Sequence, residues 1–268
     1  MSLLHPDRLF PPDPRARDIA RSLYEGVKDL PIFSPHGHCD PAWFATDAPF
    51  PDPAALLIQP DHYVLRMLAS QGIAYPELGL APKGGTAETD PRKVWRRFAR
   101  AYPLFAGTPT RLWLDHTFAE LFGLTEPLTE ETADAAYDRI ADCLAAPSHR
   151  PRALFERFGI EMLATTEGAL DPLVHHDAIR NSGWTGNVIT TYRPDSLCDP
   201  DHPTFAEDLA QFSEVADVET DTMEGYLEAH RRRRAHFRAR GAVATDHGVP
   251  DARTLDLPRT SVDELYRK

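Results

Sequence analysis

Two histidines separated by a single residue are the sharpest chemical signal in this sequence. His36 and His38 flank Gly37 and follow the apolar stretch 31–33. Side chains two positions apart on a strand point to the same side, so both imidazoles can reach one cation. Imidazole nitrogen suits zinc and other divalent transition metals. Alone, the pattern also fits two hydrogen-bonded loop histidines, but its position after an apolar run favours a metal site.

Asp246 and Arg193 also follow strand-like runs. Asp246, in the sequence Asp246-His247-Gly248, fits a general base or an outer partner of a metal ligand, and it equally fits an ordinary turn. Arg193 fits a group that binds a substrate carboxylate through two hydrogen bonds, and it equally fits an ion pair with Asp195. Both alternatives stay open at the level of sequence.

His62 and Tyr63 follow Asp61, which is a predicted helix N-cap. These two side chains could transfer protons, although a helix-start histidine beside a packed tyrosine is the simpler interpretation. His175 and His176 are interpreted as a solvated pair on a helix.

Cys39 could extend the metal site, but a small buried thiol is the better interpretation. The positions of the lysines indicate which type of metal site is possible. Only four are present, and none stands in or just after a strand-like run on the side of the two histidines. A binuclear hydrolase that bridges its metals with a carboxylated lysine needs one there, so the sequence favours a mononuclear site.

Strands alternating with helices must position these residues. The patterns predict strands at 31–33, 160–167, 187–194 and 242–248, and helices at 15–28, 61–71, 94–101, 112–122, 131–144, 152–158, 171–182, 203–213, 222–239 and from 261 onward. Such alternation is typical of a parallel sheet with helical crossovers, and the polar residues follow the apolar ones at the carboxyl ends, where barrel enzymes carry their chemistry. We divide the chain into 1–89 with the first helix and strand, a helical insertion at 90–158, and further βα units at 159–268.

The composition of the chain excludes some classes of function. The 268 residues are 42% hydrophobic and 26% charged, and many of the 25 prolines are expected in loops. The net charge of −12 argues against a non-specific nucleic-acid binder. No apolar run is long enough for a membrane span. Three cysteines without a CxxC pair favour a reducing compartment, and hence the cytoplasm.

Several segments taken together resemble uronate isomerase (glucuronate isomerase) of the amidohydrolase superfamily. They occur in the family's order from about residue 15 to the end, and each alone is weak. The matching segments are 31–38, 61–63, 111–116 (Arg-Leu-Trp-Leu-Asp-His), 163–166, 192–195 (Tyr-Arg-Pro-Asp) and 245–248 (Thr-Asp-His-Gly). Ser34, Pro35 and Gly37 depart from the commoner form of the first motif, whereas both histidines remain.

The resemblance implies a (β/α)8 TIM barrel with a helical insertion. It implies carbohydrate metabolism, with conversion of D-glucuronate to D-fructuronate and of D-galacturonate to D-tagaturonate. It further implies a divalent metal, usually zinc, on His36 and His38, and it carries over His62, Tyr63, Arg193 and Asp246 as active-site residues. Proton transfer from C2 to C1 needs an acid–base group. Either Asp246 or Tyr63 could move that proton.

One departure concerns length. The family continues well past this C-terminus and supplies a further metal-binding aspartate from its last strand. The chain is therefore expected to be the N-terminal part of the enzyme, to lack the last strands and to be inactive or nearly so alone. The competing hypotheses are another metal-dependent barrel enzyme, a hydrolase or decarboxylase, and a fragment that binds sugar acids without turnover. A uronic acid is the expected small-molecule partner, and a homo-oligomer is compatible with the sequence.

Overall fold

The computed structural model describes residues 4–248 and 254–267. The chain forms two compact units, Met1–Leu30 with Ala48–Leu154, and Pro31–Asp47 with Phe155–Lys268. We call them the first and the second unit and describe each by itself. Their boundaries fall at 31, 48 and 155, whereas the division by element type in the sequence was drawn at 90 and 159.

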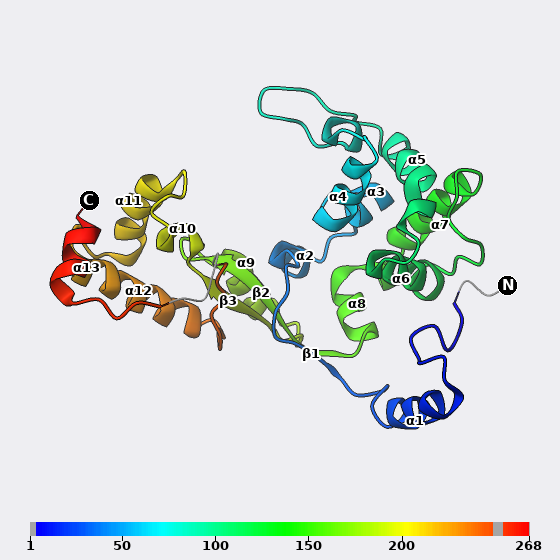
Figure 1. Ribbon diagram of the computed structural model, residues 1–268, viewed down its shortest axis with the longest axis horizontal. Helices are drawn as coiled ribbons and strands as arrows, with labels where there is room; N and C mark the ends of the chain where they lie inside the picture. The colour runs from blue at the N-terminus through cyan, green and yellow to red at the C-terminus, as the bar shows by residue number, and fades with distance from the viewer. Residues whose placement is uncertain (1–3, 249–253, 268) are drawn as a thin grey trace. The chain divides into compact units, whose positions relative to one another are not determined.

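The first unit is helical (Figure 1). Its elements are α1 (Pro14–Glu25), α3 (Pro53–Leu57), α4 (His62–Ser70), η1 (Tyr75–Leu78), α5 (Pro91–Ala101), η2 (Tyr102–Phe105), α6 (Pro109–His116), the π-helical turn η3 (Thr117–Leu121), α7 (Ala133–Ala145) and η4 (Pro147–His149). Helix α8 (Pro151–Arg157) crosses the boundary into the second unit.

A recurring Asp-Pro pair begins several of the helices. Asp13, Asp40, Asp52 and Asp90 each accept a hydrogen bond from a backbone N–H of the first turn, and proline follows each of them as the first helical residue. Proline fits there because the first helical N–H needs no partner within the helix and the ring sets a helical φ. The expectation that many prolines fall in loops is therefore wrong for this group.

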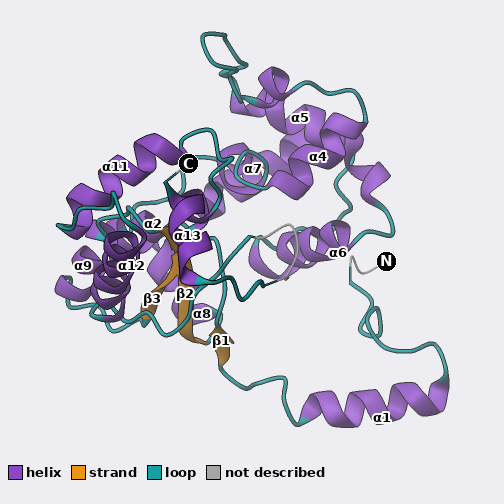
Figure 2. Ribbon diagram, turned by 60° about the vertical axis from the view of Figure 1, so that its left-hand side comes forward, coloured by secondary structure: helices purple, strands orange, loops and turns teal. Residues whose placement is uncertain are grey.

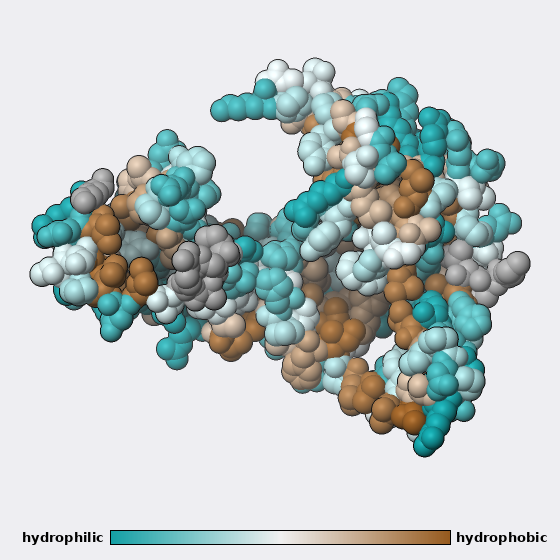
Figure 3. All heavy atoms as spheres, in the orientation of Figure 1, coloured by the Kyte–Doolittle hydropathy of each residue, from teal (hydrophilic) through white to brown (hydrophobic). Residues whose placement is uncertain are grey.

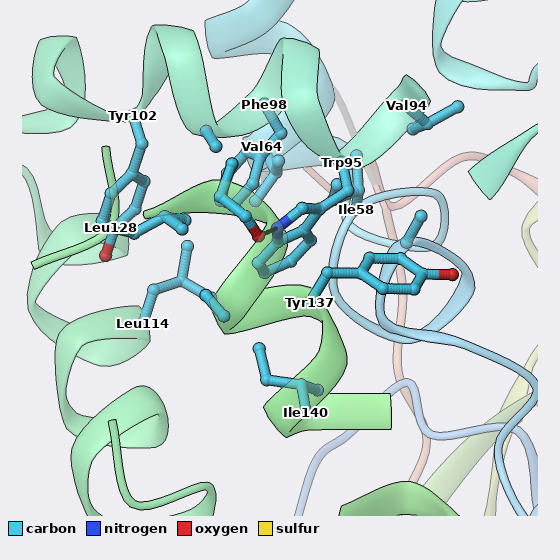
Figure 4. Close-up of a cluster of buried hydrophobic side chains, with 14 of the residues drawn as sticks. Ile58, Val64, Val94, Trp95, Phe98, Tyr102, Leu114, Leu128, Tyr137 and Ile140 are labelled. Carbon is cyan, nitrogen blue, oxygen red and sulfur yellow. Dashed lines mark hydrogen bonds between the residues drawn. The ribbon is translucent and has the colours of Figure 1, made fainter. Parts of the chain in front are cut away.

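The core of the first unit is aromatic and is centred on α5 (Figure 4). Trp95, Phe98 and Tyr102 are fully buried, and they pack with aliphatic residues of α4 and α7 such as Val64 and Ile140. The indole Nε1 of Trp95 donates a hydrogen bond to the carbonyl oxygen of Ala133, 2.8 Å away. This bond satisfies the only polar atom that the Trp95 side chain brings into the core.

The second unit contains a parallel sheet in the order β1-β2-β3. Its strands are β1 (Ile32–Ser34), β2 (Ile160–Gly168) and β3 (Val188–Arg193), with Ser34 opposite Leu163 and Gly168 opposite Arg193. The expected strand at 242–248 contributes one bridge among the described residues, between Thr245 and Tyr192, and this bridge is also parallel. Each segment therefore lies beside its predecessor in the sheet.

Helices pack on this sheet and on one another (Figure 2). They are α2 (Pro41–Thr46), α9 (Val174–Asn181), α10 (Asp195–Cys198), α11 (Phe205–Ala216), α12 (Met223–Arg238) and α13 (Arg259–Tyr266). Tyr192 of β3 packs with Phe212 and Phe237 in one cluster, and Leu163 of β2 packs with Phe44 in another. The helices thus bury one side of the strands.

These observations confirm an α/β fold with a small parallel sheet, and the full barrel stays a prediction. Exposed apolar side chains remain on the second unit, including Val243 at 82% exposure, and Figure 3 shows hydrophobic surface over the C-terminal helices. None of the helices in residues 4–248 and 254–267 has the length and apolarity needed to cross a membrane.

Candidate functional site

His36 and His38 meet just beyond the end of β1. Their Nε2 atoms lie 3.0 Å apart, and their rings meet edge to face with centroids 4.8 Å apart. Both side chains are solvent-exposed. The expectation that the two imidazoles converge is confirmed, but β1 already ends at Ser34, so a loop rather than strand alternation brings them together.

The loop between the histidines is held against β2. The hydroxyl of Thr166 donates a hydrogen bond to the carbonyl oxygen of Gly37, 3.0 Å away. A Cβ at position 37 would lie 3.0 Å from the backbone oxygen of Ala164, which is tighter than an ordinary contact. Glycine therefore lets the loop approach the strand closely enough for this hydrogen bond.

The geometry of the two histidines fits two ligands of one divalent cation. With zinc–nitrogen distances of about 2.0–2.1 Å, two nitrogens lie about 3.3 Å apart at the tetrahedral angle and about 2.9 Å apart at a right angle. The observed 3.0 Å lies between these values. Within the part of the chain that the structure describes, no cluster of three or more His, Cys, Asp or Glu side chains has a metal-binding arrangement. Two imidazole nitrogens alone do not make a complete metal site, and metal binding by His36 and His38 stays a prediction.

Asp246 lies on the other side of the His36 ring. Its Oδ2 is 3.7 Å from Nδ1 of His36, too far for a hydrogen bond, and this oxygen is buried without a hydrogen-bond partner. A carboxylate beside the second ring nitrogen of a ligand histidine is the usual way to fix its tautomer. Asp246 therefore suits an outer-partner role for His36, and the same oxygen also faces the guanidinium of Arg193.

Arg193 joins Asp246 at the carboxyl end of β3. Its Nη1 is 3.3 Å from Asp246 Oδ2, and its Nε donates a hydrogen bond to Asp195 Oδ2 at 2.7 Å. The hydrogen bond to Asp195 raises the pKa of the Arg193 guanidinium. The ion pair with Asp195 that the sequence allowed is thus present, and binding of a substrate carboxylate by Arg193 stays a prediction.

Cys39 lies partly buried against the apolar cluster of Phe44 and Leu163, and burial raises the pKa of its thiol. This environment supports the buried-thiol interpretation, because metal binding requires the thiolate.

His62 and Tyr63 belong to the first unit. They begin α4 after Asp61, whose carboxylate accepts hydrogen bonds from the N–H groups of Tyr63 and Val64 at 2.8 and 3.2 Å, so the predicted N-cap is confirmed. Their rings are in contact, with centroids 4.2 Å apart, and Tyr63 is 53% exposed. Their part in substrate binding and proton transfer stays a prediction.

A buried polar cluster behind the sheet was missed at the level of sequence. Nε2 of His176 lies 2.9 Å from the hydroxyl of Thr165 and 3.7 Å from a carboxylate oxygen of Glu167, and Thr190 donates a hydrogen bond to Glu167. Burial lowers the pKa of His176 and raises that of Glu167, because it disfavours the charged form of each. The interpretation of a solvated pair is wrong for His176, which is 1% exposed.

Comparison with known proteins places the chain in a family. A profile described as glucuronate isomerase matches residues 15–268. The chain belongs to the glucuronate isomerase family. It is 55% identical over its whole length to uronate isomerase of Mesorhizobium japonicum and 54% identical over 99% of its length to that of Phenylobacterium zucineum.

Two solved structures of the family are similar to this one. The crystal structure of glucuronate isomerase from Caulobacter crescentus matches all of the chain with a TM-score of 0.96 at 50% identity, and that of uronate isomerase from Thermotoga maritima matches 98% with a TM-score of 0.86 at 26% identity. The chain spans 55–57% of the length of these relatives.

Proposed function

We propose that this chain carries the uronate-binding and metal-binding part of an aldose–ketose isomerase. The substrates would be D-glucuronate, giving D-fructuronate, and D-galacturonate, giving D-tagaturonate. The observation that carries the proposal is the convergence of His36, His38, Asp246 and Arg193 beside the ends of neighbouring parallel strands, in a chain of the glucuronate isomerase family. Ligands bind at this edge in parallel-sheet enzymes.

Each residue has a part in this proposal. His36 and His38 hold a divalent metal, which we expect to be zinc and which would polarise a substrate oxygen. Arg193 binds the C6 carboxylate through N–H groups that Asp195 leaves free. Asp246 or Tyr63 accepts the proton from C2 and returns it to C1, because the reaction passes through an enediol and needs one group that can do both.

The wider setting belongs to the same proposal. The consecutive parallel order of β1, β2, β3 and Thr245 is the order of strands in a (β/α)8 barrel of the amidohydrolase type. The three cysteines are free thiols, which supports a cytoplasmic location. The partner is a small uronic acid, and assembly into a homo-oligomer is compatible with the fold.

Binding and turnover test the proposal separately. With zinc present, calorimetry should show that the chain binds D-glucuronate at least about tenfold more tightly than D-glucose, which has no carboxylate for a guanidinium. The preference should disappear in Arg193→Met and persist in Arg231→Met, because Arg231 is an exposed residue of α12 whose guanidinium pairs with Glu228. Equal binding of both sugars would contradict the assignment of Arg193.

The reaction type is tested by solvent deuterium. Turnover in D2O by the Caulobacter crescentus glucuronate isomerase should place deuterium at C1 of the ketose, and substitution of the residue aligned with Asp246 should slow that incorporation. Measured on the present chain alone, the same assay shows whether this chain turns over a uronate by itself. Product without deuterium would argue against proton transfer by a residue that exchanges with solvent.

A further inference from the structure

Asp195 lies at the junction of two segments that end at the candidate site. It is the first residue of α10, directly after β3 and Pro194. Its Oδ2 accepts the hydrogen bond from Nε of Arg193 at 2.7 Å, and both carboxylate oxygens lie within hydrogen-bond distance of the N–H of Gly248, at 3.0 and 2.9 Å. One carboxylate therefore ties the end of β3 to a loop 53 residues later.

Gly248 lies so close to Asp195 and Arg193 that a side chain at this position would have to move one of them. A Cβ at position 248 would lie 2.9 Å from Oδ2 of Asp195 and 3.0 Å from Nη2 of Arg193. The φ angle of Gly248 lies outside the left-handed region, so space rather than backbone conformation excludes a side chain. Any larger residue must displace the carboxylate or the guanidinium.

Arg193 is held on two sides as a result. Asp195 binds Nε, and Nη1 faces Asp246 Oδ2 at 3.3 Å. The guanidinium is planar, so contacts at two of its nitrogens fix its rotation as well as its place. Asp246 is fixed from its backbone too, because its N–H donates to the carbonyl oxygen of Tyr192 at 3.1 Å.

We propose that Asp195 is a positioning residue that holds the guanidinium of Arg193 and the loop of Asp246 in a single arrangement, with Gly248 as the neighbour that this arrangement requires. The contacts themselves are independent of the reaction. Their consequence for uronate binding rests on the proposed function, because it assumes that Arg193 binds the carboxylate.

The alternative is an ordinary surface ion pair. The side chains of Arg193 and Asp195 are 36% and 31% exposed, and pairs at such exposure often contribute little to stability. An isolated pair of that kind would leave the Gly248 N–H without a role and would not need glycine at position 248. The two hypotheses therefore differ in what they predict for Gly248.

Hydrogen exchange on the present chain separates them. In a ¹⁵N-labelled sample, the Nε–H of Arg193 and the amide of Gly248 should both be protected from exchange with solvent. In Asp195→Asn the charge is lost and the new amide group faces a donor, so both signals should exchange at least about tenfold faster. Asp201→Asn is the matched control, because Asp201 is exposed and follows on the same segment; it should leave both signals unchanged.

A pair of glycine substitutions tests the steric part. Gly248→Ala should accelerate exchange of the Arg193 signal, whereas Gly168→Ala should not, since a Cβ at position 168 meets nothing within 4 Å. The proposal is overturned if Asp195→Asn leaves the Gly248 amide as protected as in the wild type, or if Gly248→Ala and Gly168→Ala act alike. Circular dichroism of each variant confirms that the fold is kept.

A uronate titration then tests whether the contacts of Asp195 with Arg193 and Gly248, which we call the Asp195 clamp, affect uronate binding. D-glucuronate should shift the Arg193 Nε–H signal of the wild type, and Asp195→Asn should need about tenfold more ligand for the same shift, because the guanidinium is no longer held. A wild-type chain that shows protected signals and no response to D-glucuronate would refute the proposed role of Arg193 in uronate binding. The Asp195 clamp would still be supported by the protected signals. A response with equal affinity in Asp195→Asn would refute the positioning role.

Discussion

Substitution of Thr166 by valine should weaken metal binding without touching either histidine. The Thr166 hydroxyl donates the 3.0 Å hydrogen bond that holds the carbonyl oxygen of Gly37 between His36 and His38. Valine keeps the shape and removes the donor. A neutral hydrogen bond contributes about 1 kcal/mol net, and leaving the half-buried carbonyl without a partner increases the cost to about 1–2 kcal/mol. Since 1.4 kcal/mol corresponds to a factor of ten, zinc affinity should fall about 5- to 30-fold.

The assay is competition for zinc between the chain and a chromophoric chelator at fixed pH. Thr191→Val is the control, because Thr191 is also a buried threonine of the sheet but its hydroxyl forms no hydrogen bond among the described residues. Gly37→Ala should weaken binding too, because its Cβ would press on a β2 carbonyl 3.0 Å away. Unchanged zinc affinity in Thr166→Val, with the fold intact, would refute the reasoning about the loop. Wild-type binding no tighter than that of His36→Ala would refute the two-histidine site itself.

Two further predictions concern stability in each unit. The ring Nδ1 of His230 and the hydroxyl of Tyr192 share a 2.7 Å hydrogen bond, and burial lowers the pKa of His230 to about 4. Because protonation of His230 is disfavoured only in the folded state, neutral His230 contributes fully to the free energy of unfolding above the unfolded pKa of about 6.5. This contribution is lost as the pH falls towards 4. Between pH 7.5 and 4.5, urea unfolding of His230→Gln should therefore lose about 2–3 kcal/mol less stability than the wild type, and an equal loss would show that His230 is not the titrating group. In the first unit, Trp95→Phe should lower the free energy of unfolding by about 1–3 kcal/mol, because it removes the hydrogen bond to Ala133 and leaves a gap in the core. Trp113→Phe is the control, because Trp113 is 59% exposed, and it should change the free energy of unfolding by less than about 0.5 kcal/mol. Equal effects of the two substitutions would contradict the assignment of Trp95 to the core.

Local signals in the sequence predicted most of the longer helices and all three strands of the sheet. The runs 160–167 and 187–194 became β2 and β3 almost residue for residue, because their apolar and β-branched composition leaves few alternatives. The short helices α2 and α3 were missed although their start is readable. Asp40-Pro41 and Asp52-Pro53 carry the same capping signal as Asp13-Pro14 and Asp90-Pro91, and repetition of that pair was the available clue.

The error at His176 has a specific physical cause. Two adjacent histidines on a helix point about 100° apart, so one can be solvated while the other faces the core. His176 shares its face with Ile179, three residues later, and both are buried against the sheet. Thr165 and Glu167 alternate on β2 and supply the polar partners, and that alternation of buried polar residues was the signal in the strand.

The candidate site divides in the same way. His36, His38, Arg193 and Asp246 were predictable because each follows an apolar run, and carboxyl ends of parallel strands meet at one edge. The contact of Asp195 with Gly248 was not, because it joins positions 53 residues apart and depends on side-chain geometry. Sequence order carries no information on which nitrogen of Arg193 faces which carboxylate.

The register of the sheet explains why the site forms although β1 is so short. Gly168 pairs with Arg193, and Tyr192 pairs with Thr245, so Arg193 and Asp246 leave the sheet at one level. Ser34 pairs with Leu163, five residues before the end of β2. The loop with His36 and His38 therefore runs beside the last residues of β2 rather than beyond them, within reach of the Thr166 hydroxyl.

This arrangement assigns different tasks to backbone pairing and side chains. Ladder hydrogen bonds set the level of Arg193 and Asp246 to within a residue, because a shift of one position would turn both side chains to the other face of the sheet. The histidines have no ladder to hold them, so their 3.0 Å approach depends on the glycine and the threonine hydroxyl that fix the loop. Substitutions in the ladder should therefore affect stability first, whereas substitutions at Gly37 or Thr166 should affect metal affinity first.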